Sequence, residues 1–438
     1  MTLGQSTRPE DDAIELQLRD QSGAISKVIN TWKQYSYNSH FLTPTDGWSF
    51  TLGDEVVKQS ILEGIFVGQR VTLSINGHTQ GDGYVDKIQI NGNRSSGVSV
   101  SVEGRDRFAP VVDGNIDPQN VRFNSSQSLW DVLYAVFSPY GWTVQATIGP
   151  DAQYIVSNEA NRNVITGEAQ GVPATKLSKP IKSYQLHQLK PYPNEGNFAF
   201  AARVAQRFGL WIWLSADGRQ VIIGKPDFGQ AKKYDIRHKT GAAGSLNNVL
   251  DYHVERHAGE MPTVIVATGF GGGGEYPRGG LKCVFPNILT GYTALGAVRP
   301  EVQAIINANG DGKIVLPSTE SLQYLNTRAL TGVSTNFFNS QHRPMYLHDD
   351  ESKTLEQLEN FVRREMSLRQ RSALTAVYTL EGHSHNGRPW CVDTIVNVDD
   401  DVCGIHGNMW VMSRTFTKDR MSGTRTRVEL ILPYTMEF

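Results

Sequence analysis

Three short runs of alternating apolar residues near the C-terminus constrain the fold of this chain more than any other feature. They occupy residues 394–398, 410–412 and 424–432, and the polar residues 399–401 and Ser422-Gly423 separate parts of them. In a strand, successive side chains point to opposite faces. The third run therefore has an apolar face and a charged face, formed respectively by Thr426, Val428, Leu430 and Leu432 and by Arg425, Arg427 and Glu429. The pattern predicts a three-stranded antiparallel meander with one apolar face.

A similar set of runs lies near the other end of the chain. Residues 71–75, 84–90 and 98–102 alternate in the same way and are separated by turns rich in Asn and Gly. The landmark glycines, Gly83 and Gly97 here and Gly407 and Gly423 in the C-terminal set, have similar spacings. We therefore expect two copies of one small β module in each chain.

Length and charge limit the classes of protein to consider. A chain of 438 residues is long enough for two or three domains. Its 42 basic and 44 acidic residues give a formal net charge of -2, which argues against a protein that binds nucleic acid by neutralising phosphates. A protein surface that is neutral or acidic would still let DNA pass along it without binding.

The cysteines and the apolar runs indicate a soluble protein of a reducing compartment. Cys283, Cys391 and Cys403 are scattered and odd in number, so we expect free thiols and neither a disulfide framework nor a zinc site. Residues 1–12 contain no apolar signal region, and no run reaches the roughly 20 apolar residues that a membrane span needs.

The remaining patterns predict a β-rich α+β fold. We expect a first β-barrel or sandwich domain at 10–113, an α+β domain at 115–245, and a second β domain made of 246–270 and 371–438. Residues 271–370 are expected to be an irregular insertion that ends in a long helix before the C-terminal barrel. Helices are predicted after a cap at Ser126 or Ser128, after a cap at Asn197, at 300–307 and at 354–370, and a hairpin is predicted at 210–223.

Two segments resemble ligand-binding loops without meeting their requirements. Residues 269–274 match the letters of a dinucleotide fingerprint, but residues 275–280 cannot supply the helix that would hold a pyrophosphate. Asn307, Asn309 and Asp311 resemble the start of a calcium loop, yet Ser318 stands where a bidentate Glu is required. We interpret the first as a flexible loop and the second as a turn after a helix.

Histidines and carboxylates give no catalytic constellation. His383 and His385 are spaced to share one side of a strand, and we interpret them as a polar hairpin tip in preference to a metal site. The runs 349–351 and 399–401 are expected to be solvated turns. No catalytic, cofactor-binding or metal-binding residue is assigned, no cofactor is expected, and we expect a protein that is not an enzyme.

Taken in order, several stretches resemble the baseplate hub proteins of contractile-tailed bacteriophages, and most closely the Mu-like P protein family. They lie at 102–106 with 111–113, at 197–223, at 247–250, from Arg343-Pro344 into the helix at 354–370, and from 387–390 through 423–433. They span most of the chain. Each one alone is unspecific, and it is their order that carries the resemblance.

The resemblance implies a structural protein of the virion, at the tail baseplate, assembled in the host cytoplasm. It implies a homotrimer in which each chain gives two tube-like β domains, so that three chains form a ring of six modules. Such a hub of a contractile injection system would join the tail tube or its initiator protein to the central spike. Genomic DNA would pass through the lumen during ejection without specific binding.

One segment departs from the resemblance, and one rival function stays open. Residues 270–342 are longer than the family leads us to expect, and we expect an added contact surface for a baseplate wedge or neighbouring protein there. The alternative function is a tail-associated cell-wall hydrolase or glycan-binding protein, and the hydrolase would need two carboxylates at catalytic separation in a cleft.

Overall fold

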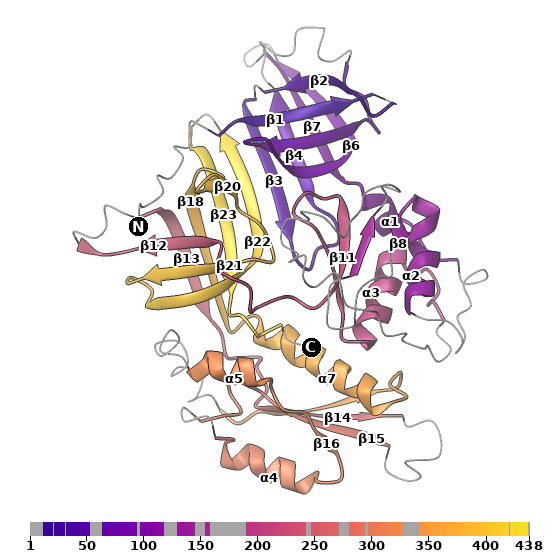
Figure 1. Cartoon of the computed structure of the whole chain (residues 1–438), viewed down its shortest axis with the longest axis vertical. Coiled ribbons are helices and arrows are strands. Elements are labelled where there is room, and N and C mark those ends of the chain that lie inside the picture. The colour runs from indigo at the N-terminus through magenta and orange to yellow at the C-terminus, as the bar shows by residue number, and fades with distance from the viewer. Residues whose placement is uncertain are drawn as a thin grey trace.

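The computed structural model describes most of the chain. The described residues are 12–20, 22–30, 32–52, 64–93, 97–117, 129–144, 154–157, 190–241, 247–270, 280–293, 297–326, 341–419 and 421–436. Four parts are visible in Figure 1: a β module at the top, a second β module at the left, an α+β unit at the right and a further sheet with helices at the bottom.

The first β module, here the N-module, contains the predicted N-terminal meander. Its strands follow the order β3-β4-β7-β6-β5-β1-β2 in one sheet, and every pairing is antiparallel. The strands are β1 (Ile14–Arg19), β2 (Ile25–Ile29), β3 (Gln34–His40), β4 (Gly47–Leu52), β5 (Arg70–Ile75), β6 (His78–Asn93) and β7 (Gly97–Asp106). The short helix α1 (Ala109–Asp113) follows β7.

Alternation builds the core of the N-module as the sequence predicts. In β1, Ile14, Leu16 and Leu18 are buried, while the residues between them are partly exposed. The turn between β5 and β6 has Asn76 at φ 51° and Gly77 at φ 78°. Two successive positive φ values are typical of a two-residue hairpin turn, and Asn-Gly is its preferred sequence.

The second β module, here the C-module, contains the predicted C-terminal meander. Strands β21 (Ile395–Asp400), β22 (Ile405–Asp419) and β23 (Gly423–Ile431) pair in that order, and β18 (Leu374–Glu381) and β13 (Val249–Arg256) extend the sheet beyond β23. Strand β12 (Tyr234–His238) joins the other side by parallel pairing with β21. The small hairpin of β19 (Ser384–His385) and β20 (Arg388–Pro389) lies between β18 and β21 in the chain.

The two modules form one continuous sheet. The second half of β22 pairs antiparallel with β3, from Ser413 opposite His40 to Asp419 opposite Gln34. A single hydrophobic core runs through both modules, with Tyr37 stacked near Phe416 at a ring distance of 6.4 Å. The fold is therefore mostly β, as the sequence predicts, and its two β modules are fused edge to edge.

The α+β unit packs on one end of this sheet. It contains α2 (Leu129–Phe137), the 3-10 turn η3 (Ser138–Tyr140), β8 (Thr143–Val144), β9 (Tyr154–Ser157), α3 (Asn197–Arg207), β10 (Trp211–Leu214) and β11 (Gln220–Gly224). Its strands pair in the order β10-β11-β9-β8. The predicted helices and the hairpin are present, although α3 begins at Asn197 with Gly196 as its cap. The expected caps Ser126 and Ser128 lie outside the described residues.

The fourth part, here the insert unit, corrects the expectation of an irregular insertion at 271–370. It contains β14 (Val264–Gly269), β15 (Leu281–Pro286), α4 (Pro300–Ala308), β16 (Lys313–Ile314), α5 (Thr319–Asn326), β17 (Pro344–Asp349) and α7 (Leu355–Gln370). Its four strands form a mixed sheet in the order β16-β15-β14-β17. The predicted helices at 300–307 and 354–370 correspond to α4 and α7.

The two faces of the insert sheet are covered by different helices. Leu358, Val362 and Met366 of α7 pack on one face, and Val302 and Ile306 of α4 pack on the other. Both helices begin as their sequences predict. Pro300 occupies the first turn of α4, and Thr354 accepts a hydrogen bond from the backbone N–H of Gln357 at the start of α7.

Two strands lie in a different part of the structure from the one in which they were predicted. Residues 234–238, expected in the α+β domain, form β12 and pair with the C-module. Residues 264–269, expected in the second β domain, form β14 of the insert unit. Both errors have one cause, because each strand pairs in parallel with a segment far away in the sequence. The division of the chain into separately folding domains stays a prediction.

Candidate functional site

The two segments that resemble ligand loops have separate outcomes. Residues 271–279 of the glycine-rich segment lie outside the described residues, and Gly269 is the last residue of β14. The calcium-like segment is a turn after α4, as interpreted, with Asn309 as the helix cap. The Asp311 carboxylate accepts hydrogen bonds from Nζ of Lys282 at 3.0 and 3.1 Å, and this contact lowers the pKa of Asp311.

The interpretation of His383 as part of a polar hairpin tip is wrong. His383 is fully buried, its backbone N–H donates to Asp12, and its ring contacts the hydroxyls of Tyr35 and Thr426. Burial, with the charges of Lys418 and Arg414, lowers the pKa of His383 to about 3. The ring is therefore a neutral packing element between the modules, while the hairpin turns at Asn386-Gly387.

The run 349–351 is also more structured than a solvated turn. Asp349 ends β17, and the Glu351 carboxylate forms an ion pair with Arg207 and lies 3.6 Å from Nη1 of Arg203. Glu351 also accepts a hydrogen bond from the hydroxyl of Tyr192. These contacts attach the insert unit to helix α3 of the α+β unit.

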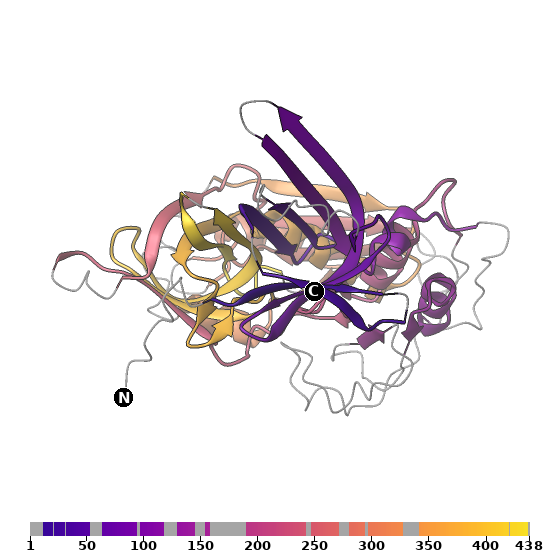
Figure 2. The same cartoon turned by 90° about the horizontal axis from the view of Figure 1, so that it is seen from above.

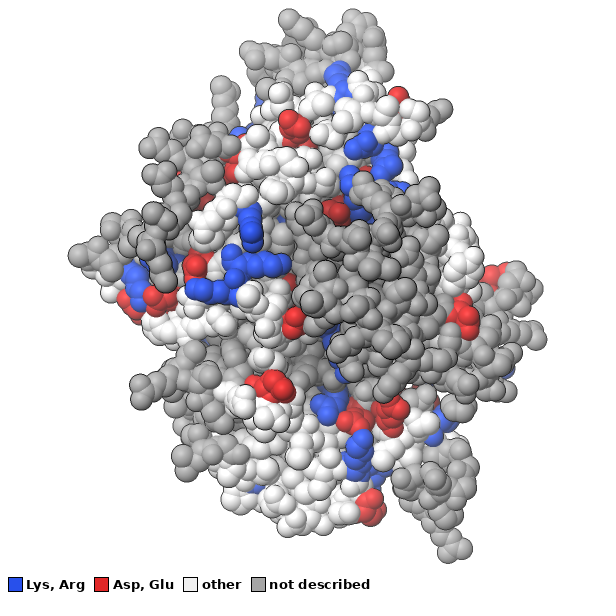
Figure 3. All heavy atoms as spheres, in the orientation of Figure 1, with Lys and Arg blue, Asp and Glu red and all other residues white. Residues whose placement is uncertain are grey.

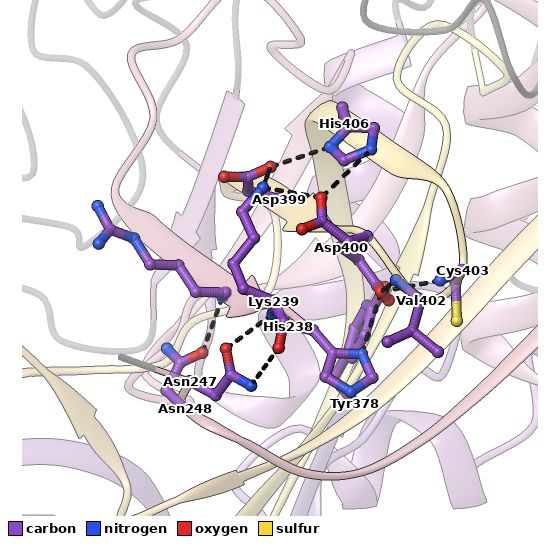
Figure 4. Close-up of polar contacts among 12 residues, drawn as sticks. His238, Lys239, Asn247, Asn248, Tyr378, Asp399, Asp400, Val402, Cys403 and His406 are labelled. Carbon is purple, nitrogen blue, oxygen red and sulfur yellow. Dashed lines mark hydrogen bonds and ion pairs between the residues drawn. The ribbon is translucent and has the colours of Figure 1, made fainter. Parts of the chain in front are cut away.

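The run 399–401 is likewise not a simple solvated turn. Strand β21 continues to Asp400, whose carboxylate is buried and accepts hydrogen bonds from the Tyr378 hydroxyl at 2.8 Å and from the backbone N–H groups of Val402 and Cys403 at 2.9 Å (Figure 4). Nδ1 of His238 lies 3.0 Å from the same carboxylate. Although burial alone would raise the pKa of Asp400, these bonds lower it.

Asp399, Asp401 and His406 are close enough to be considered as a metal site. Their potential ligand atoms lie within 4.8 Å of one another. Nζ of Lys239 lies between the two carboxylates, 2.5 Å from Asp399 and 2.9 Å from Asp401, and these contacts raise the pKa of Lys239 (Figure 4). A lysine ammonium thus already supplies the positive charge, so the cluster joins β12 to β21 and does not indicate a cation site.

Sequence reasoning missed the buried polar residues that join the parts. Arg414 of β22 is fully buried and donates to Gln80 of the N-module at 2.6 Å, to the carbonyl of Trp390 in the C-module, and to the carbonyl of Ala216 in the α+β hairpin at 3.0 Å. Its partners are far apart in the sequence. No local motif could have found this network.

A second buried contact ties the α+β hairpin to the N-module. The Asp82 carboxylate accepts two hydrogen bonds from Arg70, at 2.7 and 3.0 Å, and lies 3.2 Å from Arg219 and 3.7 Å from Arg107. Burial alone would raise the pKa of Asp82, but the three guanidinium groups lower it. These buried charges connect the α+β hairpin to the N-module.

The β modules themselves repeat residue by residue, and this repeat is the strongest functional feature. In the β6–β7 hairpin, Asn93 pairs with Gly97 and the register shifts between Val85 and Lys87. In the β22–β23 hairpin, Asp419 pairs with Gly423 and the register shifts between Val411 and Ser413. The difference in residue number is the same for Asn93 and Asp419, for Gly97 and Gly423, and for Lys87 and Ser413. The two hairpins therefore share their register, the number of residues between their strands and the position of the bulge.

The repeat continues across each sheet. The order β3-β4-β7-β6-β5-β1 of the N-module corresponds to β13-β18-β23-β22-β21-β12 of the C-module. Tyr35 faces Phe50 in β3 and β4, and Tyr252 faces Tyr378 at the corresponding positions of β13 and β18. The outermost strand differs, because β1 pairs antiparallel with β5 while β12 pairs parallel with β21. The predicted pair of like modules is thus present.

Comparisons with known proteins agree with this architecture. Residues 24–106 match the family of the Mu phage baseplate assembly protein GpP-like, N-terminal. No curated protein matches the chain. Among solved structures, the chain is similar to a tail protein from Neisseria meningitidis MC58, with a TM-score of 0.64, 17% identity and coverage of 97% of this chain and 98% of that one.

Two prophage proteins share the fold as well. The 43 kDa tail protein of prophage MuSo2 from Shewanella oneidensis matches with a TM-score of 0.62 at 17% identity, covering 97% of this chain and 99% of that one. Prophage tail protein gp18 from Listeria monocytogenes EGD-e matches with a TM-score of 0.50 at 9% identity, covering 96% and 94%. Residues 24–106 are therefore similar to the N-terminal domain of the Mu phage baseplate assembly protein GpP-like family, and the whole chain has a fold that these phage tail proteins share.

Proposed function

We propose that this protein is the structural hub of a contractile phage tail baseplate, located in the virion. Three copies form a ring of six β modules that joins the sixfold tail tube, or its initiator protein, to the threefold central spike. The observation that carries the proposal is the repeat of one β module within the chain. Two like modules in each of three chains can present six similar surfaces to one partner while the whole assembly keeps threefold symmetry for the other.

The join between the modules supports the same role. The N-module and C-module meet through strand pairing between β3 and β22 and through the buried Arg414 network. Such a junction holds neighbouring modules at a fixed angle, which a ring needs if it is to close. Buried Asp82 and partly exposed Glu351 attach the α+β unit and the insert unit to this frame through ion pairs.

The surface charges fit a non-catalytic part through which DNA passes without specific binding. On the face drawn in Figure 3, small groups of basic side chains alternate with acidic and neutral ones over the described part of the chain. Binding that depends on phosphate contacts needs a concentrated basic surface. In the described part of the chain, no helix has the length and apolar character needed to cross a membrane.

The insert unit is the surface that we assign to further contacts, including a baseplate wedge protein. It lies at the far end of the molecule from the N-module in Figure 1. Its edge strand β17 presents Tyr346, which is among the exposed large apolar side chains. The insert unit can be removed without exposing its core only if the whole sheet and both covering helices are deleted together.

Mass photometry and electron microscopy of the purified full-length chain test the proposal. We expect particles of three times the 48.6 kDa chain mass that show threefold symmetry and bind recombinant tube or spike protein. A chain that stays monomeric at high concentration and binds neither partner would refute it. Clearing of bacterial cell wall in a zymogram would instead favour the alternative of a tail-associated hydrolase.

A further inference from the structure

The internal repeat identifies which strands pair between copies of the chain. Within one chain, the second half of β22 has β23 on one side and β3 on the other. The corresponding half of β6, residues 87–93, has β7 on one side and no strand on the other among the described residues. In Figure 2 the β6–β7 hairpin projects from the body of the molecule like an arm.

The missing neighbour of β6 has a counterpart elsewhere in the chain. Strand β13 corresponds to β3 in the repeat, and within the described residues it pairs only with β18. In the described part of the chain, its outer edge therefore has no paired strand, although Asn248 just before it bonds to Arg237 and Asp235 of β12. Within the chain, β22 pairs with β3. Because β6 corresponds to β22 and β13 corresponds to β3, the matching partner for β6 is β13 of another copy. Unpaired strand edges of this kind readily pair with another chain.

Side-chain exposure at the two edges agrees with a missing partner. Phe416 of β22, which pairs with Tyr37 of β3, is 0% exposed, whereas Ile90 at the corresponding position of β6 is 58% exposed. Tyr35 of β3 is 1% exposed, whereas Tyr252 at the corresponding position of β13 is 42% exposed. Both open edges thus keep large apolar side chains at the positions that the join within the chain buries.

We propose that β6 of one copy pairs antiparallel with β13 of the next copy, in the register that β22 and β3 adopt within the chain. The register follows from three pairs of the β22–β3 ladder, when each residue is replaced by its counterpart in β6 or β13: Phe416–Tyr37, Thr417–Ser36 and Thr415–Asn38. Ile90 then lies opposite Val254, Asn91 opposite His253 and Gln89 opposite Glu255. This inference rests on the proposed ring and names the surface through which its copies join.

Cysteine crosslinking in the full-length chain tests the register. Asn91→Cys with His253→Cys, in a Cys403→Ser background, puts two thiols at directly opposed positions of the proposed ladder. Opposed residues of an antiparallel pair have Cα atoms roughly 4.5–5.5 Å apart, which is within disulfide range, while positions two residues off are roughly 7–8 Å apart. Asn91→Cys with Glu255→Cys is therefore a matched off-register control, since His253 and Glu255 are both exposed on β13.

Three outcomes are distinguishable on non-reducing gels after mild oxidation, with mass photometry run in parallel. A covalent trimer from the in-register pair and little from the control supports the pairing. A trimer by mass photometry without selective crosslinking overturns the pairing while the proposed hub stands. A chain that remains monomeric overturns the pairing together with the proposed ring.

A second variant pair tests the apolar contact without depending on disulfide formation. Ile90→Asp should raise the concentration at which the trimer dissociates by about tenfold or more, because burial of one isoleucine contributes roughly 1.5–3 kcal/mol. Leu316→Asp is the control, since Leu316 is also 58% exposed but lies in the insert unit. Equal effects of the two substitutions would contradict the proposed interface.

Discussion

Replacement of Arg414 by methionine should loosen three parts of the molecule at once. Methionine fills a similar volume but cannot donate to Gln80, Trp390 or Ala216, which are all buried. Each buried acceptor that loses its donor costs about 1–3 kcal/mol, and removal of one member of a buried charged network typically costs about 3–5 kcal/mol. We expect a loss of unfolding free energy of about 4 kcal/mol, since part of the cost of burying the guanidinium is regained.

The assay must resolve parts of the chain, because a protein of this size need not unfold in one step. Hydrogen exchange followed by mass spectrometry should show faster exchange in the 215–220 turn and at the start of β6 in Arg414→Met. Exchange in α7 and in the insert sheet should stay unchanged, because no contact of Arg414 reaches them. Urea unfolding gives the overall change.

Arg427→Met is the matched control, because Arg427 is exposed on the neighbouring strand β23. Substitutions at such surface positions usually change stability by less than about 0.5 kcal/mol. If Arg414→Met also lost less than about 1 kcal/mol, or if its faster exchange were spread evenly over the chain, the reasoning that Arg414 joins the parts would be refuted.

Three further predictions follow from single sites. Burial lowers the pKa of His383 to about 3, so between about pH 6.5 and pH 3 the unfolded chain binds a proton on this ring and the folded chain does not. The free energy of unfolding should therefore decline by up to about 1.4 kcal/mol for each pH unit over this range. Urea unfolding should show a smaller difference in stability between pH 7 and pH 4.5 for His383→Phe than for the unaltered protein. Thr354→Ala should cost about 1 kcal/mol through loss of the α7 cap, measured by thermal unfolding, while Thr354→Ser should cost little. Gly104→Ala should destabilise the N-module by more than about 3 kcal/mol, because its Cβ would lie 2.2 Å from the ring of Trp48. Gly229→Ala, whose Cβ would meet only the Asp227 carboxylate at an ordinary contact distance of 3.6 Å, should fold normally by circular dichroism.

The local elements of this protein could be predicted because their causes are local. Alternating apolar residues are sufficient to specify β21–β23 and β5–β7, since each side chain of a strand points to a fixed face. Thr354 could be recognised as the start of α7 because a cap acts over a few residues. Their spacing also allowed the repeat of one β module to be predicted, and the structure confirms it in every strand but the outermost, which pairs in the opposite direction.

Only the tertiary structure decided which strands pair, and which side chains are buried, when the residues involved lie far apart in the sequence. The parallel partners of β12 and β14 lie more than 70 residues away in the chain, so no short pattern records them. His383 and Asp400 read as exposed polar residues, and only the packing of distant strands around them makes them buried. The open edges of β6 and β13 belong to the same class, because whether a strand has a neighbour depends on the whole sheet and not on the strand's own sequence.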